Sequence, residues 1–269
     1  VGGFNNQELA HIFKSWNDGE LHSYLIGITA GIFREADDLG DGELIDRIKD
    51  SAKQKGTGRW ASIEALKQGV DISMITSACT ARIMSNHLDE REKAWQLIHS
   101  PAVGLSPDKE SFAAMVREAL YTGKIIAYAQ GFSLMQDASR LYGWNLDLGK
   151  IASIFRAGCI IQAVFLNDIT HAFEAEPKPE NLIFDGFFLS RINEHQDSLR
   201  QAVSTGVMNG LPIPALCNAV SYLDEFRAKA AGANLIQAQR DCFGAHTYER
   251  TDREGVFHHE WRWANDNQH

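Results

Sequence analysis

The sequence predicts an all-α protein that consists of two similar helical halves and a C-terminal arm. Apolar residues recur at helical spacing along most of the chain, and the alternation that is typical of β-strands is almost absent. An internal repeat is the second indication: several blocks match when the chain is laid on itself at a shift of 141 to 142 residues. We therefore expect one helical unit to be duplicated.

The matching blocks occur in the same order in both halves. Residues 9–14 match residues 151–156, while Leu25, Ile28 and Thr29 match Leu166, Ile169 and Thr170; residues 69–72 match residues 210–213, and Ala78 matches Ala219. Duplicated halves of this size usually share one core. We therefore expect a single helical domain over residues 1–234 and an arm over residues 235–269.

The first half begins with a helix that Asn5 or Asn6 can cap, with an apolar face that includes Phe13 and Trp16. A second helix is expected over residues 20–34. Residues 35–60 are polar and rich in glycine apart from a short amphipathic piece at residues 44–48, so a functional loop is expected there. Helical patterns resume at residues 61–68, 72–86 and 89–99.

The longest predicted helix runs from about residue 107 to residue 142. Ser106 is its expected N-cap and Pro107 its first helical residue. Gly123 and Gly131 within it indicate close helix contacts rather than breaks. Further helices are expected at residues 148–175, 181–193, 195–209 and 213–229.

Composition excludes several classes of protein. The 269 residues are 44% hydrophobic and 23% charged, with a formal net charge of −9 and no basic run, which argues against nucleic acid as a general partner. No stretch approaches the roughly 18 to 20 apolar residues of a membrane helix, and the N-terminus has no signal pattern. The four cysteines are far apart without a CxxC pair, which predicts neither disulfides nor a zinc site. We expect a cytoplasmic protein.

Two segments carry chemistry. Residues 54–60 (Gln-Lys-Gly-Thr-Gly-Arg-Trp) place glycines around a hydroxyl beside a cation, which suits a turn that binds an oxyanion. The alternative is an ordinary glycine-rich surface turn. Residues 238–249 carry Arg240 and His246 on a segment without a core of its own. This pattern indicates an arm that completes a site elsewhere, the alternative being a solvated tail.

The rest of the tail suggests less. His258, His259 and Glu260 are interpreted as solvated tail rather than as a metal site, because adjacent histidines rarely bind one ion. Trp261 and Trp263 have little core of their own, so docking onto a partner is expected.

Several long motifs, in order, resemble the C-terminal helical domain of the decarboxylating 6-phosphogluconate dehydrogenases, the pentose-phosphate-pathway enzymes. The resemblance covers nearly the whole chain. It is carried by residues 13–21 (FKSWNDGEL), 48–60 (IKDSAKQKGTGRW), 128–132 (YAQGF), 156–161 (RAGCII) and 239–249 (QRDCFGAHTYE).

This resemblance implies oxidation of 6-phosphogluconate with NADP, followed by decarboxylation to ribulose 5-phosphate, without a metal. Enzymes of this family also need a dinucleotide-binding Rossmann domain, and this chain has no GxGxxG motif. The family's catalytic lysine and glutamate lie just before the point where this sequence begins, so no catalytic residue is assigned. The expectation is a part of a longer enzyme that is inactive alone.

The family's substrate-binding residues map onto single positions here. The resemblance implies that Lys55, Thr57 and Arg82 bind the substrate phosphate. It implies that Arg240 and His246 reach the phosphate and sugar hydroxyls of the neighbouring subunit, in a homodimer with exchanged arms.

Two other classes of function stay open on the residues alone. One is a non-catalytic phosphosugar-binding or scaffold protein that kept the helical domain, which the reading frame upstream of Val1 would distinguish. The other is a β-hydroxyacid dehydrogenase that acts on a smaller acid. The duplicated second half and the Arg240/His246 tail argue against it, because such enzymes bind no phosphate.

Overall fold

The computed structural model describes residues 1–101, 104 and 108–261. The chain divides into two compact units, residues 1–221 and 222–269, and the boundary falls within α10 (Pro214–Arg227). The predicted all-α class is confirmed, since the only strands with assigned bounds in the described residues are two residues long each. No helix among the described residues combines the length and the apolar character needed to cross a membrane.

The first unit contains two helical hairpins at equivalent places in the predicted repeat. The first joins α1 (Asn6–Asn17) to α2 (Tyr24–Ile32), and the second joins α7 (Leu148–Ile154) to α8 (Leu166–Glu174). Each begins with a polar cap: Asn5 forms a capping box with Glu8, and the Asp147 carboxylate accepts from the Lys150 backbone.

The connections of the two hairpins pair with each other. Ser23 and Ala163 form an antiparallel bridge, in which Tyr24 N donates to Gln162 O at 3.1 Å and Val164 N donates to His22 O at 3.0 Å. A shift of 140 residues exchanges these two hydrogen bonds, so the bridge is symmetric about its centre. This is the arrangement expected of a duplicated unit packed against its copy.

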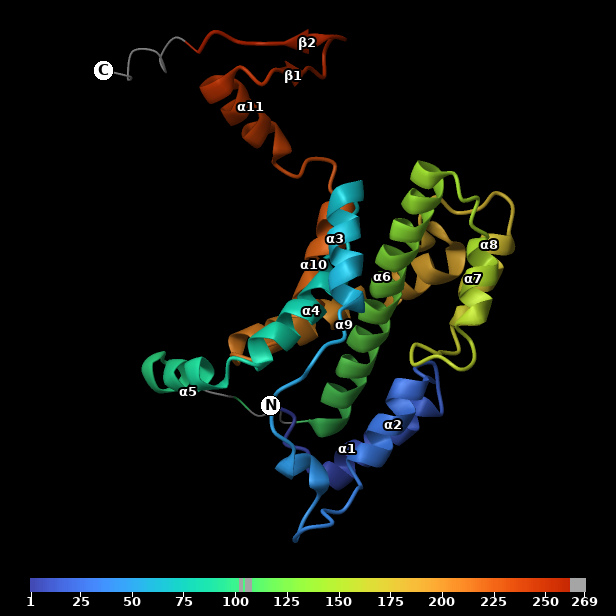
Figure 1. Ribbon diagram of the computed structural model, residues 1–269, viewed down its shortest axis with the longest axis vertical. Coiled ribbons are helices and arrows are strands. Elements are labelled where there is room, and N and C mark those ends of the chain that lie inside the picture. The colour runs from blue at the N-terminus through green and yellow to red at the C-terminus, as the bar shows by residue number, and fades with distance from the viewer. Residues whose placement is uncertain (102–103, 105–107, 262–269) are drawn as a thin grey trace. The chain divides into compact units, whose positions relative to one another are not determined.

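The 34-residue helix α6 (Lys109–Tyr142) runs through the middle of the first unit (Figure 1). It packs along α9 (Gly186–Met208), and it also contacts η2 (Leu182–Phe184), α3 (Thr57–Gln68), α4 (Ser73–Ser85) and α7. Its two central isoleucines, Ile125 and Ile126, are fully buried. The core around it includes the fully buried side chains Leu21, Phe165, Leu166, Ile169, Phe188 and Leu199.

The start of α6 differs from the prediction. Its N-cap is Asp108, whose carboxylate accepts hydrogen bonds from the backbones of Glu110 and Ser111. An aspartate caps a helix as well as a serine does, and it also favours the positive end of the helix dipole. Ser106 and Pro107, the predicted cap and first residue, lie outside the described residues.

Other predicted boundaries were wrong in ways that the structure explains. The helix predicted over residues 148–175 is interrupted between α7 and α8 by turns that include Gly158, which has a φ of 68°. Conversely, the helices predicted at 181–193 and 195–209 are one helix, α9, preceded by η2. No glycine or proline separates them, and the buried His195 keeps the segment packed.

The loop predicted over residues 35–60 contains one 3₁₀ turn, η1 (Leu44–Arg47). It is shorter than expected because α3 (Thr57–Gln68) starts within it. Two further helices follow, α4 (Ser73–Ser85) and α5 (Leu88–Leu97), and α4 packs on both α3 and α6.

The second unit is built on α11 (Ala233–Gly244) and a small hairpin. Strand β1 (Tyr248–Glu249) pairs antiparallel with β2 (Val256–Phe257), with Tyr248 opposite Phe257. The arm was predicted to lack packing of its own, and this was wrong: the described part of residues 222–269 is compact.

Gln130 of α6 caps α4, whose own N-cap residue, Ile72, makes no side-chain cap. The Oε1 atom of Gln130 accepts a hydrogen bond from Met74 N at 3.1 Å, and its Nε2 atom donates to Ser73 Oγ at 3.1 Å. The Gln130 side chain is fully buried. This hydrogen bond crosses from one helix to another, so it fixes the position of α4 on α6.

We expect Gln130→Leu to lower the free energy of unfolding by about 1 to 3 kcal/mol, because it leaves the buried Met74 N–H without an acceptor. Urea denaturation measures this. Gln96→Leu is the matched control, because the hydrogen bond of Gln96 within the described residues goes to Glu92 on the exposed face of α5, and its loss should cost less than about 0.5 kcal/mol. Equal effects of the two substitutions would contradict the capping role of Gln130.

Candidate functional site

The predicted oxyanion turn is the start of a helix. Gly56 has a φ of 102°, a left-handed conformation that favours glycine, and Thr57 is the first residue of α3. Gly56, the N-cap residue of α3, has no side chain with which to cap this end of the helix. Backbone N–H groups at such an end are suited to an anion. The segment was expected to be a loop, and the helix gives it a more rigid geometry.

Three of the five predicted site residues line one cavity in the first unit. Lys55, Thr57 and Arg82 face a space of about 690 Å³. Arg82 comes from the last turn of α4, so the packing of α4 on α3 brings it to the turn at Gly56. The full lining is residues 53–58, Met74, Ile75, Ala78, Cys79, Arg82, Ala127, Ile160 and Ala215.

The charge of this cavity is of one sign. Lys53, Lys55 and Arg82 contribute three cations, and no aspartate or glutamate lines the cavity. Within the described residues neither Arg82 nor Lys55 forms an ion pair with a carboxylate. Cations without an internal counter-ion are available for an anionic ligand.

Gly58 lets α3 approach α4 at the cavity wall. A Cβ atom at this position would overlap Cys79 Sγ of α4. The glycine is therefore needed for the contact and not for its backbone conformation, because its φ is not positive. All four cysteines are free and half-buried.

Arg240 and His246 lie in the second unit. Arg240 Nη1 donates to Gln237 Oε1 at 3.1 Å on the exposed side of α11. The His246 imidazole packs edge-on against Phe243, with ring centroids 5.8 Å apart. The structure thus brings Lys55, Thr57 and Arg82 together on one cavity of the first unit, whereas Arg240 and His246 belong to the second unit and make separate contacts there.

The sequence did not point to Asp241, the only acidic residue among those with no exposed surface in the described chain. Its carboxylate accepts from Thr247 N at 2.9 Å, His258 Nδ1 at 2.9 Å, His259 N at 3.1 Å and Trp261 Nε1 at 2.9 Å. The one available signal was a carboxylate in the middle of a helix that packs, since such a group needs several donors.

These hydrogen bonds determine the protonation of Asp241. Burial by itself would raise the pKa of the carboxyl, but the donors from His258, His259, Trp261 and Thr247 together lower this pKa below its usual range. A depressed folded-state pKa stabilises the fold above the unfolded pKa, and this stabilisation is lost as the pH falls through the folded value. Asp241 is therefore ionised throughout the neutral range.

The structure gives two side chains of the tail a partner within the chain. His258 and Trp261 both hydrogen-bond to Asp241, so this segment is attached to α11, while His258, His259 and Glu260 remain exposed. Docking of Trp261 onto a partner stays a prediction. Trp263 lies outside the described residues. Within the part of the chain that the structure describes, no group of three or more His, Cys, Asp or Glu side chains could hold a metal ion.

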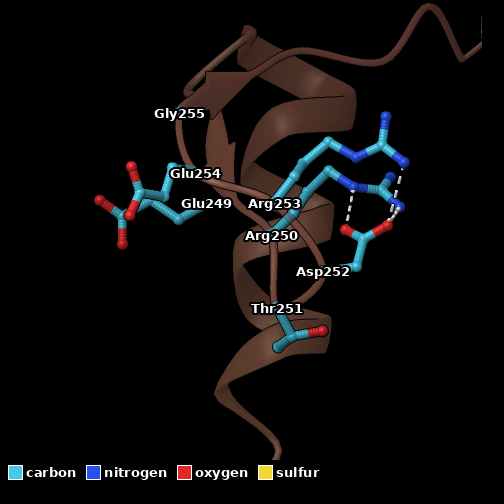
Figure 2. Close-up of a pocket in the computed structure, with 7 residues that line it drawn as sticks. All are labelled: Glu249, Arg250, Thr251, Asp252, Arg253, Glu254 and Gly255. Carbon is cyan, nitrogen blue, oxygen red and sulfur yellow. Dashed lines mark hydrogen bonds and ion pairs between the residues drawn. The ribbon is translucent and has the colours of Figure 1, made fainter.

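The hairpin turn is a second concave region, of about 550 Å³, formed by residues 249–255 alone. Figure 2 shows Arg250 and Arg253 turned toward Asp252, with Glu249 and Glu254 on the opposite side. The Arg250 hydrogen bond lowers the pKa of Asp252 to about 2. Both arginines of this turn are already paired with Asp252, so it is a weak candidate for binding an anion.

Comparison with known proteins gives consistent matches over nearly the whole chain. The family model described as "6-phosphogluconate dehydrogenase, C-terminal domain" matches residues 1–261. The chain is 48% identical over 261 residues to a decarboxylating 6-phosphogluconate dehydrogenase of Lactococcus lactis, covering 97% of this chain and 55% of that protein. The Staphylococcus aureus protein of the same name is 47% identical over 259 residues, with 96% and 55% covered.

A solved structure agrees. The Plasmodium falciparum 6-phosphogluconate dehydrogenase, studied without ligand, with its cofactor NADP+ and with its substrate 6-phosphogluconate, matches with a TM-score of 0.93 at 41% identity. The match covers 96% of this chain and 56% of that one. The chain thus spans about half the length of the relatives it matches.

Gly58→Ala is expected to reduce the free energy of unfolding by about 1 to 3 kcal/mol, because the added methyl group overlaps Cys79 Sγ. In an unconstrained helix the same change would be stabilising by about 1 kcal/mol. Combining it with Cys79→Ala removes the overlapping sulfur, so the double variant should regain most of the loss. A double-mutant cycle by urea denaturation tests this, and strictly additive effects would contradict the contact.

Proposed function

The chain belongs to the 6-phosphogluconate dehydrogenase family, whose C-terminal domain it matches over residues 1–261, and from this we propose that it forms the substrate-phosphate-binding and dimerisation part of such an enzyme. The proposed reaction is the NADP-dependent oxidative decarboxylation of 6-phosphogluconate to ribulose 5-phosphate, a step of the pentose phosphate pathway. A cytoplasmic location is part of the proposal. One observation carries it: Lys55, Thr57 and Arg82 line one cavity without a carboxylate.

The chemistry of this cavity suits a phosphoryl group. The Lys55 ammonium and the Arg82 guanidinium both donate charge-assisted hydrogen bonds, and Arg82 can do so with two parallel N–H groups. The Thr57 hydroxyl and the uncapped N–H groups of α3 add neutral donors. A phosphate dianion is attracted most strongly where no carboxylate competes for the cations. Because the chain as a whole has a net charge of −9, binding an anion requires such a local cluster of cations.

Arg240 and His246 complete the proposed site from a second copy of the chain. Their unit is compact, so it can present a cation and an imidazole in a fixed geometry. Dimerisation is supported by apolar side chains left exposed on α2, where Tyr24, Leu25, Ile28 and Ile32 are 39% to 50% exposed. For an obligate pair of this kind we expect an interface well above roughly 2,000 Å² of total buried area.

The residues of this chain do not fit NADP. A dinucleotide is held at the edge of a parallel sheet by a glycine-rich turn, and the described residues contain only the antiparallel pair β1 and β2. We therefore assign no cofactor contact to this chain and derive no hydride step from it. Binding and orientation of the substrate phosphate are what its own residues provide.

The function is tested with two proteins, the full reading frame that encodes this chain and the 269-residue chain alone. We expect the first to form NADPH and CO₂ from 6-phosphogluconate, and the second to form no NADPH, because hydride transfer requires a cofactor held against the substrate. The chain alone should still bind 6-phosphogluconate, with weaker binding in Lys55→Ala. NADPH formation by the chain alone would contradict the proposal that this chain binds substrate without supplying the cofactor site. An inactive full-length protein would contradict the proposed dehydrogenase activity.

The composite site is tested by subunit mixing. Arg240→Ala should weaken substrate binding by roughly 1.5 to 3 kcal/mol, the loss of one charged hydrogen bond. Arg250→Ala is the control, because Arg250 pairs with Asp252 in its own turn. A heterodimer of an Arg240→Ala subunit and an Arg82→Ala subunit keeps one intact site. Recovery of activity on mixing supports arms that act on the partner subunit, and a lack of recovery contradicts them.

A further inference from the structure

The loop that carries His246 has a backbone conformation that is unfavourable without support from other parts of the chain. Ala245 and Thr247 have φ values of 49° and 62°, in the left-handed region that residues other than glycine rarely adopt. Such conformations persist only when the surrounding structure fixes them. The question for this loop is which contacts do so.

Two side chains of α11 fix Thr247 from both sides. Asp241 Oδ1 accepts from Thr247 N at 2.9 Å, and Gln237 Nε2 donates to Thr247 O at 2.6 Å. Gln237 and Asp241 are four residues apart, so they lie on the same face of the helix. The backbone of α11 also reaches the loop, since Ala245 N donates to Asp241 O at 2.9 Å.

The same two side chains connect this loop to the rest of the arm. Gln237 Oε1 accepts from Arg240 at 3.1 Å, so one amide group contacts both Arg240 and the loop of His246. Asp241 uses its remaining capacity on His258, on the His259 backbone and on Trp261, beyond β2. Its two oxygens each accept two hydrogen bonds.

Gly244 provides the space for the imidazole. A Cβ atom there would lie 2.9 Å from two ring atoms of His246, which is closer than real Cβ contacts come. The ring therefore rests over this glycine and against Phe243.

We infer that Asp241 is a positioning residue that preforms the arm: its carboxylate holds the His246 loop and the segment after β2 on α11, with Gln237 in a supporting role. No proposed substrate contact is assigned to Asp241, because all its accepting positions are used within the arm. Its effect on the substrate rests on the proposed function, whereas its effect on the arm does not. Preorganisation of this kind reduces the entropy lost when Arg240 and His246 bind a ligand.

The test compares Asp241→Asn with Asp252→Asn. Both are aspartate-to-asparagine changes in the same unit, but Asp252 is exposed and, within the described residues, forms its ion pairs with arginines of its own turn. An asparagine at 241 keeps one acceptor oxygen and directs an NH₂ group at two donors. Hydrogen exchange of the 269-residue chain, followed by mass spectrometry, measures the exchange rates of the backbone amides in the arm directly.

In Asp241→Asn the NH₂ group replaces the acceptor of either Thr247 N or His259 N, so at least one of these two amides should exchange at least roughly tenfold faster, a change that corresponds to about 1.4 kcal/mol. Helices of the first unit should keep their exchange rates, which identifies a variant that is folded. Asp252→Asn should leave residues 245–261 close to wild type apart from its own turn. Unchanged exchange at Thr247 and His259 in Asp241→Asn would overturn the inference.

Kinetics of the full reading frame provides the second readout. Asp241→Asn should raise KM for 6-phosphogluconate about tenfold or more and change kcat by less than about threefold, because a ligand-presenting arm is loosened while the chemistry is untouched. Gln237→Ala, which leaves the contacts to His258 and Trp261 in place, should raise KM by a smaller factor. Faster exchange with an unchanged KM would overturn the positioning role.

The two proposals fail in different ways. If the wild-type protein does not oxidise 6-phosphogluconate, the proposed function is wrong, and the exchange experiment still decides whether Asp241 holds the arm. If the wild type is active and Asp241→Asn behaves like Asp252→Asn in both readouts, only the role of Asp241 is wrong.

Discussion

The packing of the first unit on helix α6 is the constraint on which the cavity depends. α3, α4, α7 and α9 all contact this one helix, and its fully buried Gln130 supplies the N-cap that α4 lacks. Because a buried N–H group without an acceptor is destabilising, the hydrogen bond from Met74 N to Gln130 fixes the position of α4 along the axis of α6. Arg82 sits in the last turn of α4, so its place at the cavity wall follows from a contact made at the other end of that helix.

No single part of the cavity indicates a phosphate site by itself. The turn at Gly56 provides an uncapped helix end and a lysine, and α4 provides an arginine. Each has an ordinary structural explanation alone. What makes the set informative is the lack of a carboxylate among the lining residues, in a chain where acids outnumber bases. Close contact between Gly58 and Cys79 keeps the two helices near enough for both cations to face the same space.

The arm is stabilised in a different way from the first unit. It has few apolar side chains to bury, and its order comes from a buried polar group, the Asp241 carboxylate. A buried carboxylate is tolerated only when donors satisfy it, and here four donors from two parts of the arm do so. The energetic requirement of one charge therefore organises the turn after α11 and the segment after β2. A small unit with little core can reach a defined geometry in this way.

The sequence by itself determined the helical class, the approximate repeat and the segments that carry the chemistry. Apolar periodicity reports the buried face of a helix directly, and the turn at residues 54–60 and the segment around Arg240 and His246 stood out by residue type. Family resemblance then assigned roles to Lys55, Thr57 and Arg82, and the structure places these three on one cavity.

Only the tertiary structure decided the rest, because the decisive groups interact across long sequence separations. Gln130 meets Met74, and Gly58 meets Cys79, through helix packing that local patterns do not encode. The unbroken α9 and the early start of α3 follow from burial and a left-handed glycine, not from propensity alone. Asp241 looked like any helical aspartate, since a carboxylate becomes an organising centre only when folding brings its donors from residues 247 to 261 around it.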